Sequence, residues 1–456
     1  MSEDESDLRE GLRMTAPPDP ADLEAEIQEL ARLESGSSWR RWVGYLRMGG
    51  PGYLQAALTL GTGTATYALT AGAAYGYRLL WVAPTGMLIG IVMMLAISWQ
   101  TLSTGQRPFS AMRRYAGPFF AWGWALGAVL ASIVWHFPQY SVSAACMADL
   151  VDYWGWRAAP QPLLAVFLLI IAVTSALLSA RSARSRRAYE RFLKWMVWSI
   201  VICFGVVVYR TGVSDWSAVF RGYFAFEVPA DERGLTTVVS GLSAAVGINM
   251  VFLYPYTLLA RGWGRAHRNL AQADLLAGMF LPYLIATSLL VIASANTLYP
   301  QAAGRLQPAD VAQAIAPIIG EGFSRTALNL GVIAMALSSI SLHMLCCGFV
   351  AVEVFGCAVG SRTWRLATLL PTPGVMGPLV WQHSPVWLGV LTNVICAFFL
   401  PVAYLGFFLM QRRRDYLKDA MPQGWRGRLW LGAMAAVILL LLFFLWRLLR
   451  EKVFGA

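Results

Sequence analysis

The residues with the clearest potential for chemistry lie in the middle of one long apolar stretch, residues 49–82. At its centre are Thr59, Gly61, Thr62, Gly63 and Thr64, which place helix-weakening glycines and several hydroxyl groups at mid-membrane depth. A helix that breaks there frees backbone N–H and C=O groups, and such a break must be buried in protein or line a cavity. We interpret these residues as candidate substrate-binding residues, with close helix packing through small residues as the alternative.

A second break is predicted in the apolar segment 236–260, where small or polar residues interrupt the pattern. Ala244, Gly247 and Asn249 are the candidate substrate-binding residues of this break, and Pro255 follows them. The two segments occupy corresponding positions in two halves of the chain that have opposite orientations. Discontinuous helices at corresponding positions of inverted repeats are the pattern from which transporter sites are built.

The composition is typical of a polytopic membrane protein. Of 456 residues, 57% are hydrophobic and only 13% are charged, and the mean hydropathy is +0.54. The net charge of +11 comes mainly from arginines that lie between the spans rather than on one face, so no nucleic-acid partner is expected. The six cysteines lie in or beside apolar segments without the spacing of a zinc site, and we interpret them as small buried residues.

About eleven membrane spans are predicted, with the approximate limits 51–75, 79–103, 117–148, 162–180, 192–210, 236–260, 274–298, 326–358, 364–381, 385–410 and 429–449. Pro371, Pro373 and Pro378 interrupt the ninth. The arginine-rich loops fall on one side, which the positive-inside rule assigns to the cytoplasm, and the N-terminus lies on that side. We expect the plasma membrane, as a bacterial inner membrane, without a cleaved signal peptide.

The chain is predicted to divide into three parts. Residues 1–48 form an acidic cytoplasmic tail, in which residues 20–34 have the pattern of an amphipathic helix. Residues 49–411 form the core, with one repeat in 49–211 and the second in 235–411. Residues 412–456 form a cytoplasmic loop and one extra transmembrane helix. The lipid bilayer and a small solute or ion are the expected partners, and no oligomer is required.

Several motifs resemble the NRAMP family of divalent-metal transporters. Gly-Pro-Gly at 50–52, Ala-Gly-Ala at 71–73, Tyr-Gly-Tyr at 75–77 and Leu-Leu-Trp-Val at 79–82 are similar to the first span of that family. The resemblance covers roughly residues 48–412. It implies an all-α integral membrane protein of the LeuT type with two inverted five-helix repeats. It also implies an alternating-access transporter rather than an enzyme, and no cofactor.

The chain departs from this family where the family binds metal. The Asp-Pro-Gly-Asn motif of the family falls on Gly61–Thr64, its Met-Pro-His motif on Gly247–Asn249, and a glutamine of its tenth span on Asn393, the last candidate substrate-binding residue. The resemblance therefore implies a dismantled transition-metal site, so we expect no metal ligands and poor binding of Mn²⁺ and Fe²⁺. Three glycines predict an enlarged pocket for a hydrated or weakly held cation. The alternatives are a small polar organic solute, or a non-transporting membrane scaffold or sensor.

Two histidines within predicted spans are candidates for proton coupling. His136 lies in the third span, where the proton path of the family would run, and His343 lies in the eighth. Ionisable groups inside a membrane are functional hypotheses by default, and neutral histidines bonded to a neighbouring helix are the alternative. Uncoupled transport with a permanently neutral His136 also remains open.

Overall fold

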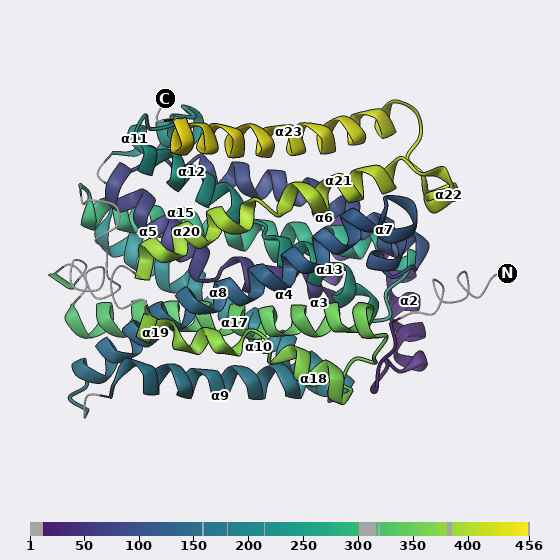
Figure 1. The fold of residues 1–456 in the computed structure, drawn as a ribbon, viewed down its shortest axis with the longest axis horizontal. Helices are drawn as coiled ribbons and strands as arrows, with labels where there is room; N and C mark the ends of the chain where they lie inside the picture. The colour runs from purple at the N-terminus through teal and green to yellow at the C-terminus, as the bar shows by residue number, and fades with distance from the viewer. Residues whose placement is uncertain are drawn as a thin grey trace.

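The computed structural model describes residues 12–156, 159–179, 181–213, 215–300, 316–317, 320–380 and 385–454. Within these residues the regular structure is helical, apart from an isolated bridge between Met14 and Val359. The long helices run side by side along one axis, which is horizontal in Figure 1. Helix α2 (Pro20–Glu34) confirms the helix predicted over 20–34, and the end of α23 (Gly424–Phe454) lies at the opposite end of the axis.

The first half of the core begins with a broken helix and continues with long unbroken ones. Its helices are α4 (Pro51–Thr59), α5 (Thr62–Tyr75), α6 (Val82–Thr104), α8 (Pro118–Tyr153), α9 (Gln161–Ser179) and α10 (Ala183–Thr211). Shorter helices flank or connect them, namely α3 (Ser38–Met48), α7 (Pro108–Tyr115) and α11 (Trp216–Phe224). Proline opens α4, α7 and α8, where the missing N–H group costs no helical hydrogen bond.

The second half also begins with a broken helix. Its elements are α12 (Glu232–Ala244), α13 (Ile248–Ala260), η1 (Arg265–His267), α14 (Arg268–Asp274), the π-helical turn η2 (Leu275–Phe280), α15 (Leu281–Leu298), α17 (Glu321–Phe355), α18 (Arg362–Thr368), η3 (Thr372–Met376), α19 (Gly377–Val380), α20 (Pro385–Ala397) and α21 (Leu400–Gln411). α22 (Arg414–Leu417) and η4 (Lys418–Ala420) lead from it to α23.

The predicted number of spans agrees with the structure except at the ninth. Nine helical segments among the described residues are long and apolar enough to cross a membrane, and the α4–α5 pair adds a further broken one. The predicted ninth span, 364–381, is instead divided into α18, η3 and α19. Pro371, Pro373 and Pro378 account for this division, because each proline removes a backbone donor and disfavours a continuous helix.

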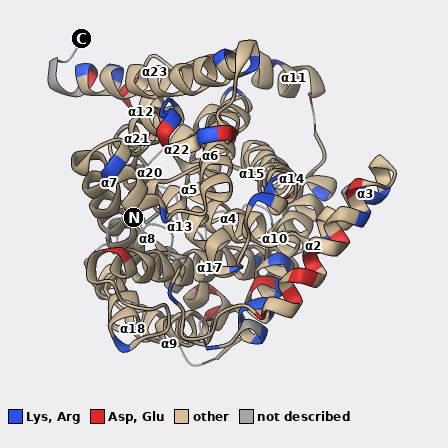
Figure 2. Ribbon diagram, turned by 90° about the vertical axis from the view of Figure 1, so that its right-hand side faces the viewer, with Lys and Arg blue, Asp and Glu red and all other residues tan. Residues whose placement is uncertain are grey.

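The broken helices occupy the centre of the bundle. The apolar window of the segment 232–260 is entirely buried inside the protein, whereas α9, α10 and α23 leave most of theirs exposed at the periphery. α12 packs against α5 and α20, while α17 packs along α8. In the end view of Figure 2, charged residues gather on and beside α2 and α3. The centre is therefore apolar and helical, and charged residues gather on α2 and α3 at one end of the molecule.

Candidate functional site at the two helix breaks

Both predicted helix breaks are present. α4 ends at Thr59 and α5 begins at Thr62, so Leu60 and Gly61 leave the helical path. α12 ends at Ala244 and α13 begins at Ile248, which leaves residues 245–247 unwound. The observed breaks are shorter than the predicted ones, and each frees only a few backbone groups.

Side chains of α17 and α5 satisfy the carbonyl groups that the first break frees. Ser338 Oγ donates to Ala57 O at 3.0 Å, and Ser339 Oγ donates to Leu58 O at 3.2 Å. Thr64 Oγ1 donates to Thr59 O in a short hydrogen bond. A buried carbonyl without a partner is costly, so these hydroxyl groups stabilise the interruption. Thr64, a predicted site residue, thus helps to stabilise the interruption between α4 and α5.

Asn393 joins the first break to the second broken helix. Its Nδ2 group lies 3.1 Å from Gly63 O and 2.9 Å from Ser240 Oγ. Its backbone carbonyl accepts a hydrogen bond from Ser243 Oγ at 3.0 Å. The structure therefore brings Asn393 to the predicted site, where its amide links α5, α12 and α20.

The two breaks meet at Thr59. Its Oγ1 atom lies 3.3 Å from Ala245 O and 3.3 Å from Met250 Sδ. Met250 is buried, and its sulfur also lies 3.4 Å from the backbone nitrogen of Gly247. A hydroxyl, a carbonyl released from the helical ladder and a thioether thus converge between α4 and α13.

Sequence reasoning missed Met250 because it sought the family's methionine at Gly247. Side chains in a helix tilt toward its N-terminus. A methionine at the third position of α13 can therefore reach back over the break that precedes it, as Met250 does. The available signal was a thioether in the first turn after a predicted break.

The expected enlargement of the pocket by three glycines is wrong for this structure. A Cβ atom added at Gly61 would overlap Ser339 Oγ, and one at Gly63 would lie 2.5 Å from the Trp135 ring. At Gly247 it would lie 2.6 Å from Asn249 Oδ1. Neighbouring side chains fill the space that larger residues would occupy, so the centre is closely packed.

Two candidate residues keep unsatisfied polar atoms at the breaks. Thr62 Oγ1 and Asn249 Nδ2 are buried, and neither has a hydrogen-bond partner in the part of the chain that the structure describes. Buried polar groups are nearly always paired, so Thr62 Oγ1 is available to donate or accept a hydrogen bond or to bind a cation, whereas Asn249 Nδ2 can only donate to an acceptor. No group of three or more His, Cys, Asp or Glu side chains that could hold a metal ion occurs among the described residues. The ligand atoms at the breaks are therefore neutral.

The two candidate proton-coupling histidines lie together beside the first break. Their ring centroids are 5.9 Å apart, and Gln139 Nε2 lies 3.3 Å from His343 Nδ1. His136 Nδ1 lies 2.7 Å from Pro371 O, and its Nε2 lies 3.2 Å from Ile340 O. A neutral imidazole can donate to only one of these carbonyl groups, whereas the protonated ring can donate to both.

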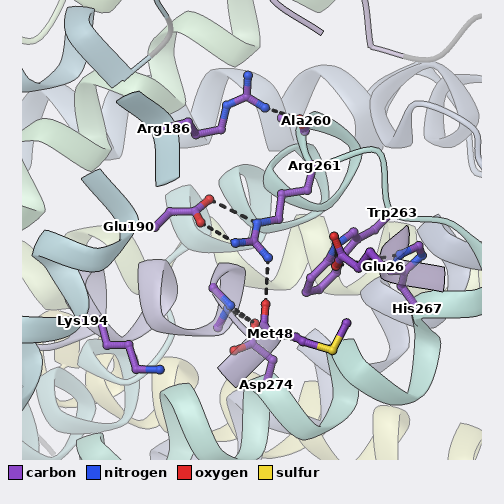
Figure 3. Close-up of polar contacts among 12 residues, drawn as sticks. Glu26, Met48, Arg186, Glu190, Lys194, Ala260, Arg261, Trp263, His267 and Asp274 are labelled. Atoms are coloured by element: carbon purple, nitrogen blue, oxygen red, sulfur yellow. Dashed lines mark hydrogen bonds and ion pairs between the residues drawn. The ribbon is translucent and has the colours of Figure 1, made fainter. Parts of the chain in front are cut away.

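Charged residues hold the start of α4 at the end of the molecule that carries α2 (Figure 3). Glu190 pairs with Arg261 at 2.6 Å, and Arg261 Nη1 donates to Met48 O at 3.0 Å. Asp274 Oδ2 accepts hydrogen bonds from the backbone nitrogens of Gly50, at 3.2 Å, and Gly52, at 2.6 Å. The Gly-Pro-Gly motif has a physical reason here, because a Cβ atom at Gly52 would overlap the backbone of Asp274.

Helix α2 covers the same region. Asp22 pairs with Arg187 at 3.1 Å, Trp263 Nε1 donates to Glu26 at 2.9 Å, and Asn269 donates to Glu34 at 2.9 Å. Burial raises the pKa of Glu26 above its ordinary value. Together with Arg261 and Asp274, these contacts hold α2 and the start of α4 together at this end, around a cavity of about 300 Å³. Sequence analysis assigned Glu190 and Asp274 no role, although Asp274 stands out as an acid at the start of the predicted span 274–298.

A cavity of about 510 Å³ lies at the opposite end of the molecule. Aromatic, charged and amide side chains line it, including those of Tyr75, Tyr77, Arg78, Arg221, Glu227 and Asn296. Arg78 pairs with Glu227 at 3.0 Å. This polar cavity is therefore separate from the closely packed helix breaks.

Two broken helices that meet at the centre of an all-helical bundle define an integral membrane protein of the LeuT type. Solved structures agree with this class: MhsT in complex with L-phenylalanine matches 86% of this chain and 98% of its own, with a TM-score of 0.57 and 15% identity. A manganese transporter of Eremococcus coleocola, in a mutant form, has a TM-score of 0.72 at 14% identity, with 97% of this chain and 91% of that chain covered.

The family model described as natural resistance-associated macrophage protein-like, Nramp, matches residues 52–447, and the chain belongs to that family. The predicted resemblance is thereby confirmed. A "Divalent metal cation transporter MntH" of Deinococcus radiodurans is 24% identical over 449 residues, which cover 95% of this chain and 97% of the relative. A protein of the same name from Chromohalobacter salexigens is 22% identical over 414 residues, 86% of this chain and 89% of the relative.

Proposed function

We propose that this protein is an alternating-access membrane carrier for a divalent cation that binds between the two helix breaks. Family membership and the names of its relatives support transport of a metal cation. The observation that carries the proposal is the convergence of Thr59 Oγ1, Ala245 O and Met250 Sδ. These are ligand atoms of the kinds that bind cations, and they come from both broken helices.

The ligands also favour a cation that keeps much of its water. Oxygen atoms of Thr59, Thr62 and Ala245 are neutral, as is the sulfur of Met250. Removing the hydration shell of a divalent ion inside a membrane is expensive when no anionic ligand replaces it. We therefore propose weak binding, in which direct contacts are few and water supplies the remaining ligands, in a conformation whose centre is less closely packed than the one described here.

The end with α2 and α3 is proposed to face the cytoplasm of a bacterial plasma membrane. Arginine-rich loops support this orientation, because positive residues are retained on the cytoplasmic side. In this orientation the contacts of Arg261 and Asp274 hold the start of α4 at the cytoplasmic end. The cavity of about 510 Å³ then lies on the outer side.

Uptake by the purified protein in liposomes tests this proposal. We expect saturable uptake of Mn²⁺ or Mg²⁺, followed with ion-sensitive dyes inside the vesicles. Met250→Ala should reduce Mn²⁺ uptake more than Mg²⁺ uptake, because a thioether favours the softer ion. Met279→Ala, which also truncates a buried methionine, is the matched control. Failure to transport any divalent cation at millimolar concentration would contradict the proposal.

One observation favours a second candidate, a non-transporting membrane scaffold or sensor. The centre is closely packed at Gly61 and Gly63, which is the arrangement expected of a scaffold. The same liposomes distinguish the two candidates, because a scaffold catalyses no uptake of any ion. The small organic solute has no comparable support, since the enlarged pocket on which it depended is filled.

A further inference from the structure

Helix α3 has two different faces. On one face Tyr45 is buried and donates to Glu34 at 3.5 Å, while Gly44 packs so closely against Leu33 that a Cβ atom would overlap it. On the other face Trp39, Trp42 and Leu46 are 77%, 45% and 39% exposed. Their spacing of three and four residues aligns them along the helix. α3 therefore docks on α2 and leaves an apolar stripe without a partner.

The apolar stripe continues the lipid-facing surface of the bundle. Lys194 of α10 donates to the backbone carbonyl of Leu46 at 3.0 Å, which fixes α3 beside that helix. Phe192 and Trp195 of α10 are 50% and 75% exposed, as expected of a peripheral membrane-spanning helix. In the end view α3 lies at the outer edge of the molecule (Figure 2). The bilayer that surrounds α10 therefore also reaches α3.

The charges on α3 complement an anionic membrane surface. Arg40 and Arg47 are exposed and form no ion pair with any described residue, and Arg47 also lines a cavity that it shares with Asp22 and Glu26 of α2. Tryptophan and arginine on adjoining sides of a short helix are typical of segments that lie in the interface, with the rings among the acyl chains and the cations at the phosphates. Each arginine near such a surface strengthens binding.

We propose that α3 is an interfacial helix that binds anionic phospholipid at this end of the molecule through Trp39, Trp42, Leu46 and the flanking arginines. This proposal does not depend on the identity of the transported ion. Gly49 and Gly50 connect α3 directly to α4, the helix whose start Asp274 holds. Lipid binding at α3 therefore fixes the position from which α4 begins.

The full-length chain in single-copy lipid nanodiscs provides the test. A nitroxide on Leu46→Cys reports the apolar stripe, and one on Arg32→Cys, an exposed site on α2, is the matched control. The parent chain, labelled in the same way, measures the signal from its own cysteines. Discs contain either phosphatidylcholine alone or a mixture with phosphatidylglycerol. The measured quantity is the accessibility of each nitroxide to oxygen relative to a water-soluble nickel complex.

We expect the ratio of oxygen accessibility to nickel accessibility to be several-fold higher for the Leu46→Cys label than for the Arg32→Cys label. The difference between the two labels should be larger in discs that contain phosphatidylglycerol. Arg40→Gln and Arg47→Gln should each weaken this docking by about fivefold in the anionic discs. Arg32→Gln, an equal change of charge, should have no effect. Equal accessibility of the two labels in both lipids would overturn the proposal. A Leu46→Cys label that is shielded from the nickel complex only in discs with two copies of the chain would also overturn the proposal. It would indicate that a second chain covers the apolar stripe.

Discussion

At the scale of single residues, the glycine at position 61 is required by packing rather than by backbone conformation. Gly61 has the extended angles φ −96° and ψ −171°, which other residues adopt readily. Its added Cβ atom would overlap Ser339 Oγ and lie 2.9 Å from Leu58 O. We expect Gly61→Ala to lower the free energy of unfolding by about 1–3 kcal/mol, the usual cost of overpacking, as measured by thermal unfolding in detergent.

The control for this substitution is Gly432→Ala in α23, where an added Cβ atom meets no atom within 4 Å. Alanine there should be neutral or slightly stabilising, because glycine in a helix interior is unfavourable. A Gly61→Ala protein as stable as the parent would show that the break is less tightly packed than described.

Residue identities predicted the breaks but not what surrounds them. Glycine, threonine and asparagine placed the interruptions near Gly61 and Gly247 because helix weakening is a local property. The packing of Ser339 and Trp135 against the glycines depends on α17 and α8, which are distant in sequence. The enlarged pocket was therefore wrong, and no local pattern could have corrected it. Met250 was missed for a different reason, since its role follows from the direction of a helical side chain.

At the scale of elements, Asp274 holds α4 in its observed position. Its carboxylate accepts hydrogen bonds from the backbone nitrogens of Gly50 and Gly52. Hydrogen bonds to a charged group contribute about 1.5–3 kcal/mol each, so Asp274→Ala should shift α4 toward an open position. We expect a cysteine introduced at Leu58 to react faster with a water-soluble maleimide in the Asp274→Ala background.

Asp419→Ala is the matched control for that experiment. Asp419 is exposed and pairs with Arg265 at 2.9 Å, away from α4. Its loss should leave the reaction rate at position 58 unchanged, because exposed ion pairs contribute little. Equal rates in the Asp274→Ala and parent backgrounds would mean that other contacts, such as those of Arg261, hold α4 alone.

The docking of α2 should depend on pH through Glu26. Burial raises the pKa of Glu26 above its ordinary value of 4.5, so docking favours the protonated carboxyl group. The added stability is fully present below pH 4.5 and is lost as the pH rises through the raised value. The protection factors of the α2 amides, which correct for the intrinsic pH dependence of hydrogen exchange, should therefore be higher at pH 5 than at pH 8.

Glu26→Gln should remove this part of the pH dependence, because its amide is neutral at both values. Glu29→Gln is the control, since Glu29 pairs only within α2, with Arg32 at 3.6 Å. His267 lies 4.0 Å from Glu26, and His267→Gln separates the contribution of the imidazole. An unchanged pH dependence in Glu26→Gln would exclude Glu26 as its source.

At the scale of the whole molecule, the two halves of the chain meet at one small polar centre, where Thr59 contacts Ala245 and Met250. Inverted repeats could be predicted from the sequence because paired interruptions in apolar segments are visible there. The contacts of Glu190, Arg261 and Asp274 could not, since they join α10 to the end of α13, and α14 to the start of α4, across separate parts of the chain. In the proposed carrier we expect these contacts to separate during transport while the breaks keep their packing partners, because α4 belongs to both regions.

Proton coupling would allow a proton gradient to drive cation transport through the proposed site. His136 is the candidate residue for this coupling. Protonation lets the ring donate to both Pro371 O and Ile340 O, so it should draw the segment at 371 and α17 toward α8. Ile340 follows Ser339, whose hydroxyl stabilises the first break, so a shift of α17 at Ile340 reaches the proposed ion site.

In proteoliposomes with an imposed pH gradient, we expect cation uptake by the parent to respond to the gradient and uptake by His136→Gln to lose that response. His267→Gln, at the end that carries α2, should behave as the parent. A gradient effect of equal size in the His136→Gln protein would remove this histidine from the mechanism, and no effect in either protein would indicate uncoupled transport.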